Sequence, residues 1–234
     1  MLTLVGWIDG LTASGVLIFG LLFGFFFIYK SKKTSAKILL ALGLANLFAG
    51  LVFLGVFLDF VTVLITGVNI DNTYGLVGIL SYIWLAPVII TAIYIGVKLL
   101  VPKFKWVILS LFVVLSILFE VIIFLYPFAA FNFGYPPSPG ELLIDYNIII
   151  LSIAGILMAL FLLSTIILLG FGFLMKAFQS TGVLKKKFLL LSLGAIFFCV
   201  FGLLEGLTEP GLMLIFVRIG YLISFWFMYY GLKD

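Results

Sequence analysis

The sequence is dominated by apolar runs that are each long enough to cross a bilayer as an α-helix. Spanning about 30 Å of hydrocarbon takes roughly 20 helical residues, and only 9% of the 234 residues are charged. A soluble domain carries roughly 25% charged residues, so lipid must surround most of this chain. The sequence predicts seven spans, at about 4–29, 37–60, 75–98, 105–127, 146–175, 187–208 and 211–231.

These runs are typical of helices rather than of strands. A membrane β-barrel needs alternating apolar and polar residues, whereas Val16–Ile28 and Ile148–Leu163 are apolar all round. A helix also satisfies its backbone hydrogen bonds within one segment, as the bilayer interior requires. We therefore expect an all-α, polytopic membrane protein, a single seven-transmembrane helix bundle over residues 1–234.

The charged residues of the predicted connections are segregated by sign. All the lysines fall on one side of a seven-span arrangement: Lys30, Lys32, Lys33, Lys37, Lys98, Lys103, Lys105, Lys176, Lys185, Lys186, Lys187 and Lys233. The connections on the other side contain no Lys or Arg, and their acidic residues are Asp71, Glu141, Asp145 and Glu209. Because positively charged loops stay in the cytoplasm, we expect a multi-pass protein of the plasma membrane with its N-terminus outside and its C-terminus in the cytoplasm.

The net charge of +4 is explained by this topology and predicts no nucleic-acid partner. The lysines hold the loops inside and contact anionic headgroups; a dedicated acidic partner at Lys185–Lys187 is the alternative. The lipid bilayer is thus the first expected partner. A protein partner has two surfaces on which to dock, the lysine-rich cytoplasmic loops and the lipid-facing helices.

Ionisable residues inside the spans are the candidates for a functional site, because a charge is costly there. Arg218 lies seven residues into the last span, and Glu120 lies seven residues from the outer end of the fourth without an obvious partner. Glu205 is near the outer end of the sixth span, and Asp59 closes the second. Tyr221 shares a helix face with Arg218.

Two interpretations of Arg218 follow. It either holds an anionic group or gates a pathway in an outer-half polar site, or it forms a buried structural ion pair. Glu205 on the neighbouring helix is the simplest partner, because a guanidinium forks well onto a carboxylate.

Two further features bear on a pocket and on packing. Pro87 deletes a backbone hydrogen bond and should kink the third span, so that Tyr82, Trp84 and Thr91 either line a polar pocket or simply mark a packing bend. The outer segment 127–145 is either a lid over that pocket or an aromatic segment at headgroup level. Small residues at Gly20 and Gly24, and at Gly202 and Gly206, predict close helix packing.

Missing residue types exclude most enzyme classes. The chain has no histidine, which removes bis-His haem ligation, zinc proteolysis of the H-E-x-x-H type and Ser–His catalysis. Cys199 is the single cysteine, so a thiolate cluster is excluded as well. We therefore expect no catalytic residue, no metal site and no cofactor.

Seven spans, an outside N-terminus and short loops resemble the opsin-like and receptor-like seven-helix proteins, and the seven-helix sensor regions of prokaryotic histidine kinases. The resemblance covers the whole chain but rests on topology alone. Retinal-binding members carry a Schiff-base lysine midway along the seventh span, where this chain has Arg218, and the third span offers no aspartate counter-ion. Retinal is therefore not expected. Because no transmitter follows Gly231, we expect a signal to pass to a separate partner.

The first functional hypothesis is accordingly a receptor-like or sensor-like protein acting on a separate partner. The alternatives are a small transporter or channel with an outer-half polar site, and an accessory subunit of a larger membrane complex. Because the inner half holds few polar residues, we expect any cavity to open outward near Arg218 and to end before the cytoplasmic face. The many Phe and Lys residues with a single Arg suggest a prokaryotic source.

Overall fold

The computed structural model describes residues 1–208 and 211–233; Glu209 and Asp234 lie outside this range. Most of the described chain is helical. The elements are α1 (Leu4–Thr34), α2 (Lys37–Leu51), α3 (Leu54–Thr66), α4 (Leu76–Tyr82), α5 (Leu85–Leu100), η1 (Pro102–Phe104), α6 (Lys105–Leu125), α7 (Pro127–Ala130), β1 (Phe131–Gly134), β2 (Asp145–Ile148), α8 (Ile153–Thr165), η2 (Ile166–Gly170), α9 (Phe171–Phe178), α10 (Gly182–Glu205) and α11 (Leu212–Leu232). The prediction of an all-α, membrane-type chain is confirmed, apart from one small hairpin.

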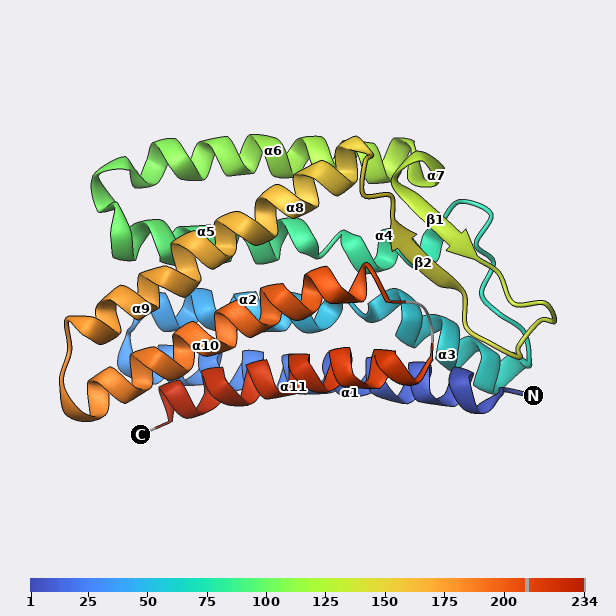
Figure 1. Ribbon diagram of the computed structural model, residues 1–234, viewed down its shortest axis with the longest axis horizontal. Coiled ribbons are helices and arrows are strands. Elements are labelled where there is room, and N and C mark those ends of the chain that lie inside the picture. Colours follow the sequence, from blue (N-terminus) through green and yellow to red (C-terminus); the bar gives the residue numbers. More distant parts are fainter. Residues whose placement is uncertain (209–210, 234) are drawn as a thin grey trace.

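Six helical segments of the described chain are long and apolar enough to cross a membrane, and a seventh is added if the bent pair α2–α3 is one span. The helices lie side by side along the long axis, with the N-terminus and the β1–β2 hairpin at one end and the C-terminus at the other (Figure 1). The α1–α2, α5–α6 and α9–α10 connections lie at the C-terminal end (Figure 1). Many large apolar side chains of α6 are exposed, among them Trp106, Val114 and Phe124. Such a face needs lipid or another protein around it.

The predicted span 37–60 is not one straight helix. It is divided into α2 and α3, which meet at an angle of 43°, and α3 continues to Thr66. The amide of Gly55 lies in the first turn of α3, where a helix leaves its amides without intrahelical acceptors. The Ser81 hydroxyl accepts its hydrogen bond at 3.1 Å, so the side chain of a neighbouring helix stabilises the break.

The predicted span 75–98 is also interrupted, at Ile83 and Trp84 between α4 and α5. This break lies directly before Pro87, whose ring clashes with the carbonyl of the residue four positions earlier, Ile83. The predicted kink is therefore present. Ser81 lies just before this break. It is fully buried and forms hydrogen bonds with other elements.

The predicted fifth span, 146–175, begins later than expected. Residues Asp145–Ile148 form β2, which pairs antiparallel with β1, and the helix starts only at Ile153. Ser152 explains this start, because its hydroxyl accepts from the amide of Gly155 at 3.0 Å as an N-cap does. Farther along, the helix contains a π-helical turn, Ile166–Gly170, and the Ser192 hydroxyl of α10 donates to the Gly170 carbonyl at 2.8 Å.

The two predicted glycine pairs differ in how closely other helices approach them. A Cβ at Gly20 would lie 2.5 Å from the Cα of Gly50, and one at Gly24 would lie 2.8 Å from the backbone nitrogen of Leu47. This pair therefore permits the close crossing of α1 and α2. A Cβ at Gly202 would meet nothing nearer than 3.5 Å, and one at Gly206 nothing nearer than 3.8 Å. A Cβ at either position of the second pair would make only ordinary van der Waals contacts, so this pair is not a close helix crossing.

Candidate functional site

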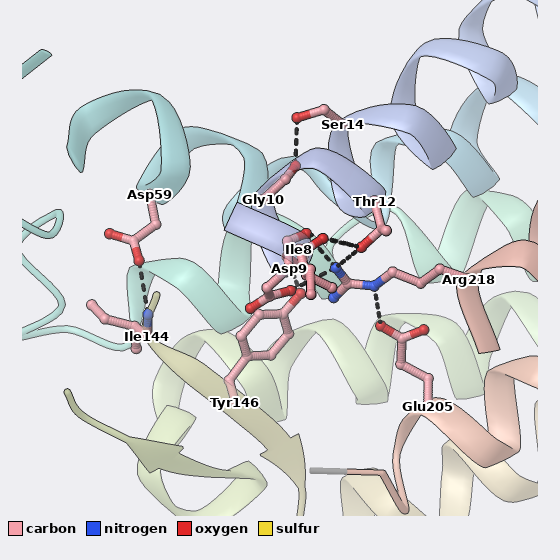
Figure 2. A network of polar contacts seen from close by, with 11 residues as sticks. Ile8, Asp9, Gly10, Thr12, Ser14, Asp59, Ile144, Tyr146, Glu205 and Arg218 are labelled. Carbon is pink, nitrogen blue, oxygen red and sulfur yellow. Dashed lines mark hydrogen bonds and ion pairs between the residues drawn. The ribbon is translucent and has the colours of Figure 1, made fainter. Parts of the chain in front are cut away.

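Arg218 lies at the centre of a buried charge cluster built from α1, α10 and α11 (Figure 2). Its Nε lies 3.2 Å from Oε1 of Glu205, the partner expected from the sequence. Its Nη1 lies 2.5 Å from Oδ1 of Asp9 and donates to the Asp9 backbone carbonyl, also at 2.5 Å. The cation is therefore placed between two carboxylates, and the arginine is only 3% exposed.

Two other groups hold the guanidinium in place. The Thr12 hydroxyl accepts from Nη1 at 2.9 Å and itself donates to the Ile8 carbonyl at 2.7 Å. The ring of Phe53 lies 5.5 Å from the guanidinium carbon, within the range of a cation–π contact. The arginine thus has acceptors from α1 and an aromatic face next to α3.

Asp9 is the site residue that sequence reasoning missed. It is the sixth residue of α1 and is 6% exposed, so it lies inside the membrane-type helix rather than at its end. The signal was present, because an acidic residue within an apolar run of spanning length is as unusual as Arg218. Only the packing of α1 against α11 shows that these two residues are partners.

The cluster borders a cavity in which the centres of water molecules can occupy a volume of about 90 Å³. The residues that line it are Asp9, Val52, Phe53, Val56, Tyr82, Leu85, Val88, Ile144, Asp145, Tyr146, Asn147, Met158, Leu162, Phe198, Gly202, Glu205, Gly206, Thr208, Leu214, Arg218 and Tyr221. One water needs about 10–15 Å³ of such space, so the cavity has room on the order of six to nine waters. Most of its wall is apolar or aromatic, and the charges gather in one part.

The hairpin strand β2 forms part of the cavity wall. Ile144 and the first three residues of β2 line the cavity, and Tyr146 lies beside Asp9 and the guanidinium (Figure 2). The Tyr146 hydroxyl donates to Ser81 Oγ at 2.7 Å, which ties the strand to the break between α4 and α5. The segment 127–145 therefore contributes directly to this end of the cavity.

Some of the residues predicted for the pocket line the cavity and others do not. Tyr82 and Tyr221 line the cavity, whereas Trp84 and Thr91 do not. Trp84 stacks on Phe48 with ring centroids 6.0 Å apart. Thr91 donates to the Pro87 carbonyl of its own helix at 2.7 Å.

Asp59 belongs to a separate, structural cluster. It is fully buried, and its carboxylate accepts from the Ile70 amide at 2.8 Å, the Ile144 amide at 2.8 Å and the Asn69 side chain at 3.0 Å. It points to Ile144 and away from Arg218 (Figure 2). Asp59 therefore joins the middle of α3 to the α3–α4 loop and to the connection within the hairpin.

In the α3–α4 loop, Asp71 has a local role. The Thr73 hydroxyl and amide both donate to its carboxylate. These hydrogen bonds hold the pKa of Asp71 below its ordinary value, because they stabilise the charged form.

Glu120 is also separate from Arg218. Both of its carboxyl oxygens are buried and lack a hydrogen-bond partner among the described residues. The side chain lies in a groove between α5 and α6 that is otherwise apolar apart from Ser116. The structure therefore does not bring Glu120 into the charge cluster.

The cavity ends well before the lysine-rich connections. The lining residues farthest along their helices from the hairpin end are Val88, Leu162 and Phe198. Beyond Val88 and Phe198, which border both, lies a second cavity of about 40 Å³. It is lined mainly by apolar side chains, together with Asn46 and Thr165, whose side-chain oxygens have no hydrogen-bond partner among the described residues.

Over residues 1–208 and 211–233, no group of His, Cys, Asp and Glu side chains is arranged to hold a metal ion. The chemistry available at the charge cluster is therefore that of a cation, carboxylates, phenols and aromatic faces around a small cavity. No protein-family model, no curated protein and no solved structure matches this chain.

Proposed function

We propose that this protein is a receptor-like or sensor-like membrane protein that binds a small ligand in the cavity next to Arg218. The observation that carries the proposal is the cavity itself, which joins buried charges to an aromatic wall within a membrane-type bundle. Small-molecule sites are typically concave and mostly apolar with a few placed polar groups. Because α3, α10, α11 and β2 all contribute to this wall, a ligand there contacts several elements at once.

The proposal includes a topology of seven spans in the plasma membrane, with the N-terminus outside. It is supported by the termini at opposite ends of the bundle (Figure 1), which requires an odd number of crossings. It is also supported by the lysine-rich connections at the C-terminal end, since such connections stay cytoplasmic. In this orientation the charge cluster lies in the outer half.

Signal transfer is proposed to run along α11 to the cytoplasmic connections, where a separate protein partner would receive it. This helix is continuous from Leu212 to Leu232, so it joins the cavity to the opposite end of the bundle. There the Lys30 side chain donates to the Leu232 carbonyl at 2.5 Å. A displacement of Arg218 on ligand binding would thus reach the α1–α2 connection without an intervening loop.

A cavity-filling substitution tests the proposal. Gly202 lines the cavity, and a Cβ there would make ordinary van der Waals contacts with Tyr221 and Leu162, so Gly202→Val should reduce the cavity without a clash of its Cβ. A library of small molecules is screened by thermal shift on the detergent-purified protein. Compounds that stabilise the wild type should lose their effect on Gly202→Val. The matched control is Gly15→Val, because a Cβ at Gly15 meets no atom within 4 Å. Equal stabilisation of both variants would contradict a site in this cavity.

A transporter or channel is the second candidate, and the second cavity favours it. If Val88 and Phe198 moved apart, the two cavities would join and extend the route toward Asn46 and Thr165. A solute needs polar groups or water all along its path, and these two residues would supply some of them. Protein in liposomes should show no proton, sodium or chloride flux above empty vesicles if the sensor proposal is right. A flux that Arg218→Met abolishes would favour transport instead.

A further inference from the structure

The charges around the cavity are not balanced. Within its lining, the one guanidinium of Arg218 is shared by two carboxyl groups, those of Asp9 and Glu205. With all three groups ionised, this cluster carries one negative charge more than positive ones. An uncompensated charge in a medium of low dielectric is costly, so the cavity favours an additional positive charge over a negative one.

The hydrogen bonds around the cavity also favour a positively charged ligand. Arg218 already donates to Glu205, to the Asp9 carbonyl and to Thr12, so much of its donor capacity is used. Oε2 of Glu205 is buried and accepts no hydrogen bond in the described part of the chain. Oδ1 of Asp9, on a residue 94% buried, pairs with the guanidinium. The cavity therefore offers a carboxylate acceptor on Glu205 beside the hydroxyl groups of Tyr82 and Tyr221.

The rest of the wall suits the body of an organic cation. Phe53, Tyr82, Phe198 and Tyr221 line the cavity, and aromatic faces attract cations as well as apolar groups. Most of the other side chains that line the cavity are apolar, among them Val52, Leu85 and Met158. A small aryl- or alkyl-ammonium compound would place its charge near Glu205 and Asp9 and its body against these side chains.

We propose that the ligand of this cavity is a small organic cation, an amphiphilic ammonium compound. This inference rests on the proposed ligand-binding function and names its ligand class. It follows the second of the two sequence-based interpretations of Arg218, the buried ion pair, and not the first, in which Arg218 holds an anionic group: the arginine is already bound by carboxylates, and its role here is to position them.

The test compares three probes of similar size and different charge: 2-phenylethylamine, 2-phenylethanol and 3-phenylpropionate. Binding to the purified wild-type protein in a neutral detergent is measured by calorimetry. The amine should bind at least about ten-fold more tightly than the alcohol or the acid, because a hydrogen bond to a charged group contributes about 1.5–3 kcal/mol and ten-fold corresponds to about 1.4 kcal/mol.

Two variants locate the preference. Glu205→Gln keeps the shape of the side chain and removes its charge, and it should weaken amine binding by about ten-fold or more. Glu120→Gln is the matched control, because Glu120 is also a carboxyl group within a membrane-type helix but does not line this cavity. Amine binding to the control should equal that of the wild type.

The outcomes separate the two proposals. Equal or tighter binding of the acid or the alcohol would overturn the cation inference and leave the cavity as a ligand site. Binding of none of the three would also overturn it, and the library screen described above would then decide the proposed function by itself. The comparison of probes on the wild type needs no variant, so it stands even if Glu205→Gln fails to fold.

Discussion

At the scale of single residues, the main finding is that the buried arginine is shared by two carboxylates. Glu205 approaches its Nε and Asp9 its Nη1, with distances of 3.2 and 2.5 Å. Removing one member of a buried ion pair leaves an uncompensated charge, whereas replacing all members by neutral groups does not. The stability of variants should therefore depend on how many of the three charges remain.

We expect Arg218→Met to lower the free energy of unfolding by about 3–5 kcal/mol, the range for breaking buried pairs in soluble proteins. Arg218→Met with Glu205→Gln should recover part of this loss. The triple variant, which adds Asp9→Asn, should recover more, because neither of the two carboxylates that pair with Arg218 is then left without its cation. Thermal unfolding in detergent measures the series. A triple variant no more stable than Arg218→Met would contradict the three-charge cluster.

Asp59 gives a second residue-scale prediction. Its carboxylate accepts three N–H groups from two connections, and an amide in its place would turn one acceptor into a donor. We expect Asp59→Asn to destabilise the protein by about 1.5–3 kcal/mol, the value of a hydrogen bond to a charged group. Hydrogen exchange should increase at the Ile70 and Ile144 amides. Asp71→Asn is the control, because Asp71 bonds only within its exposed turn, and it should change stability little.

At the scale of elements, the breaks and bends are stabilised by contacts between elements. Ser81 accepts from Gly55 at the start of α3 and from Tyr146 of β2, so one hydroxyl joins both interrupted helices and the hairpin. Ser192 likewise bonds the π-helical turn at Gly170. Interrupted helices leave backbone groups free, and these side chains are where some of those groups find partners.

The α1–α2 crossing provides a test at this scale. A Cβ at Gly20 would overlap the backbone of Gly50, and backbone cannot move aside as a flexible side chain does. Gly20→Val should therefore destabilise the protein by about 1–3 kcal/mol or more, the cost of overpacking. Gly15→Val, on the same helix with open space beside it, should have little effect. Similar melting temperatures for the two variants would show that this crossing is looser than the structure has it.

At the scale of the whole molecule, the two ends of the bundle differ in charge. The lysine-rich α1–α2, α5–α6 and α9–α10 connections and the C-terminus lie at one end, and the hairpin and the N-terminus lie at the other (Figure 1). This arrangement gives each end a distinct surface for a maleimide reagent to reach.

Cysteine labelling should report this orientation. Ser138 lies in the exposed loop of the hairpin and Thr181 in the exposed α9–α10 connection. In intact cells, an impermeant maleimide should modify Ser138→Cys and should modify Thr181→Cys only after permeabilisation. Native Cys199 is 1% exposed, so the background should be low. The reversed pattern would place the N-terminus inside.

The sequence was enough to predict the membrane class, the approximate helices, the bend at Pro87 and the pairing of Arg218 with Glu205. These follow from local properties: run length, charge, and the steric effect of a proline on its own helix. It did not predict the division of the second span, because that break depends on Ser81 of a neighbouring helix accepting the Gly55 amide. It did not predict the strand at Asp145–Ile148 either, since a strand of four residues that leads directly into an apolar run cannot be told from the start of a helix by its pattern.

The candidate site shows most clearly which features the sequence predicts and which it does not. Arg218, Glu205 and Tyr221 share a cavity, but so do Asp9 from the first helix and Tyr146 from the hairpin, at sequence separations that no local pattern connects. Glu120 and Asp59 carry the same kind of charge and lie elsewhere. The sequence determined which residues are costly to bury in a membrane-type helix. Only the tertiary structure decided which of them meet, because partnership between buried charges depends on how the helices pack and not on where each residue lies in its own helix.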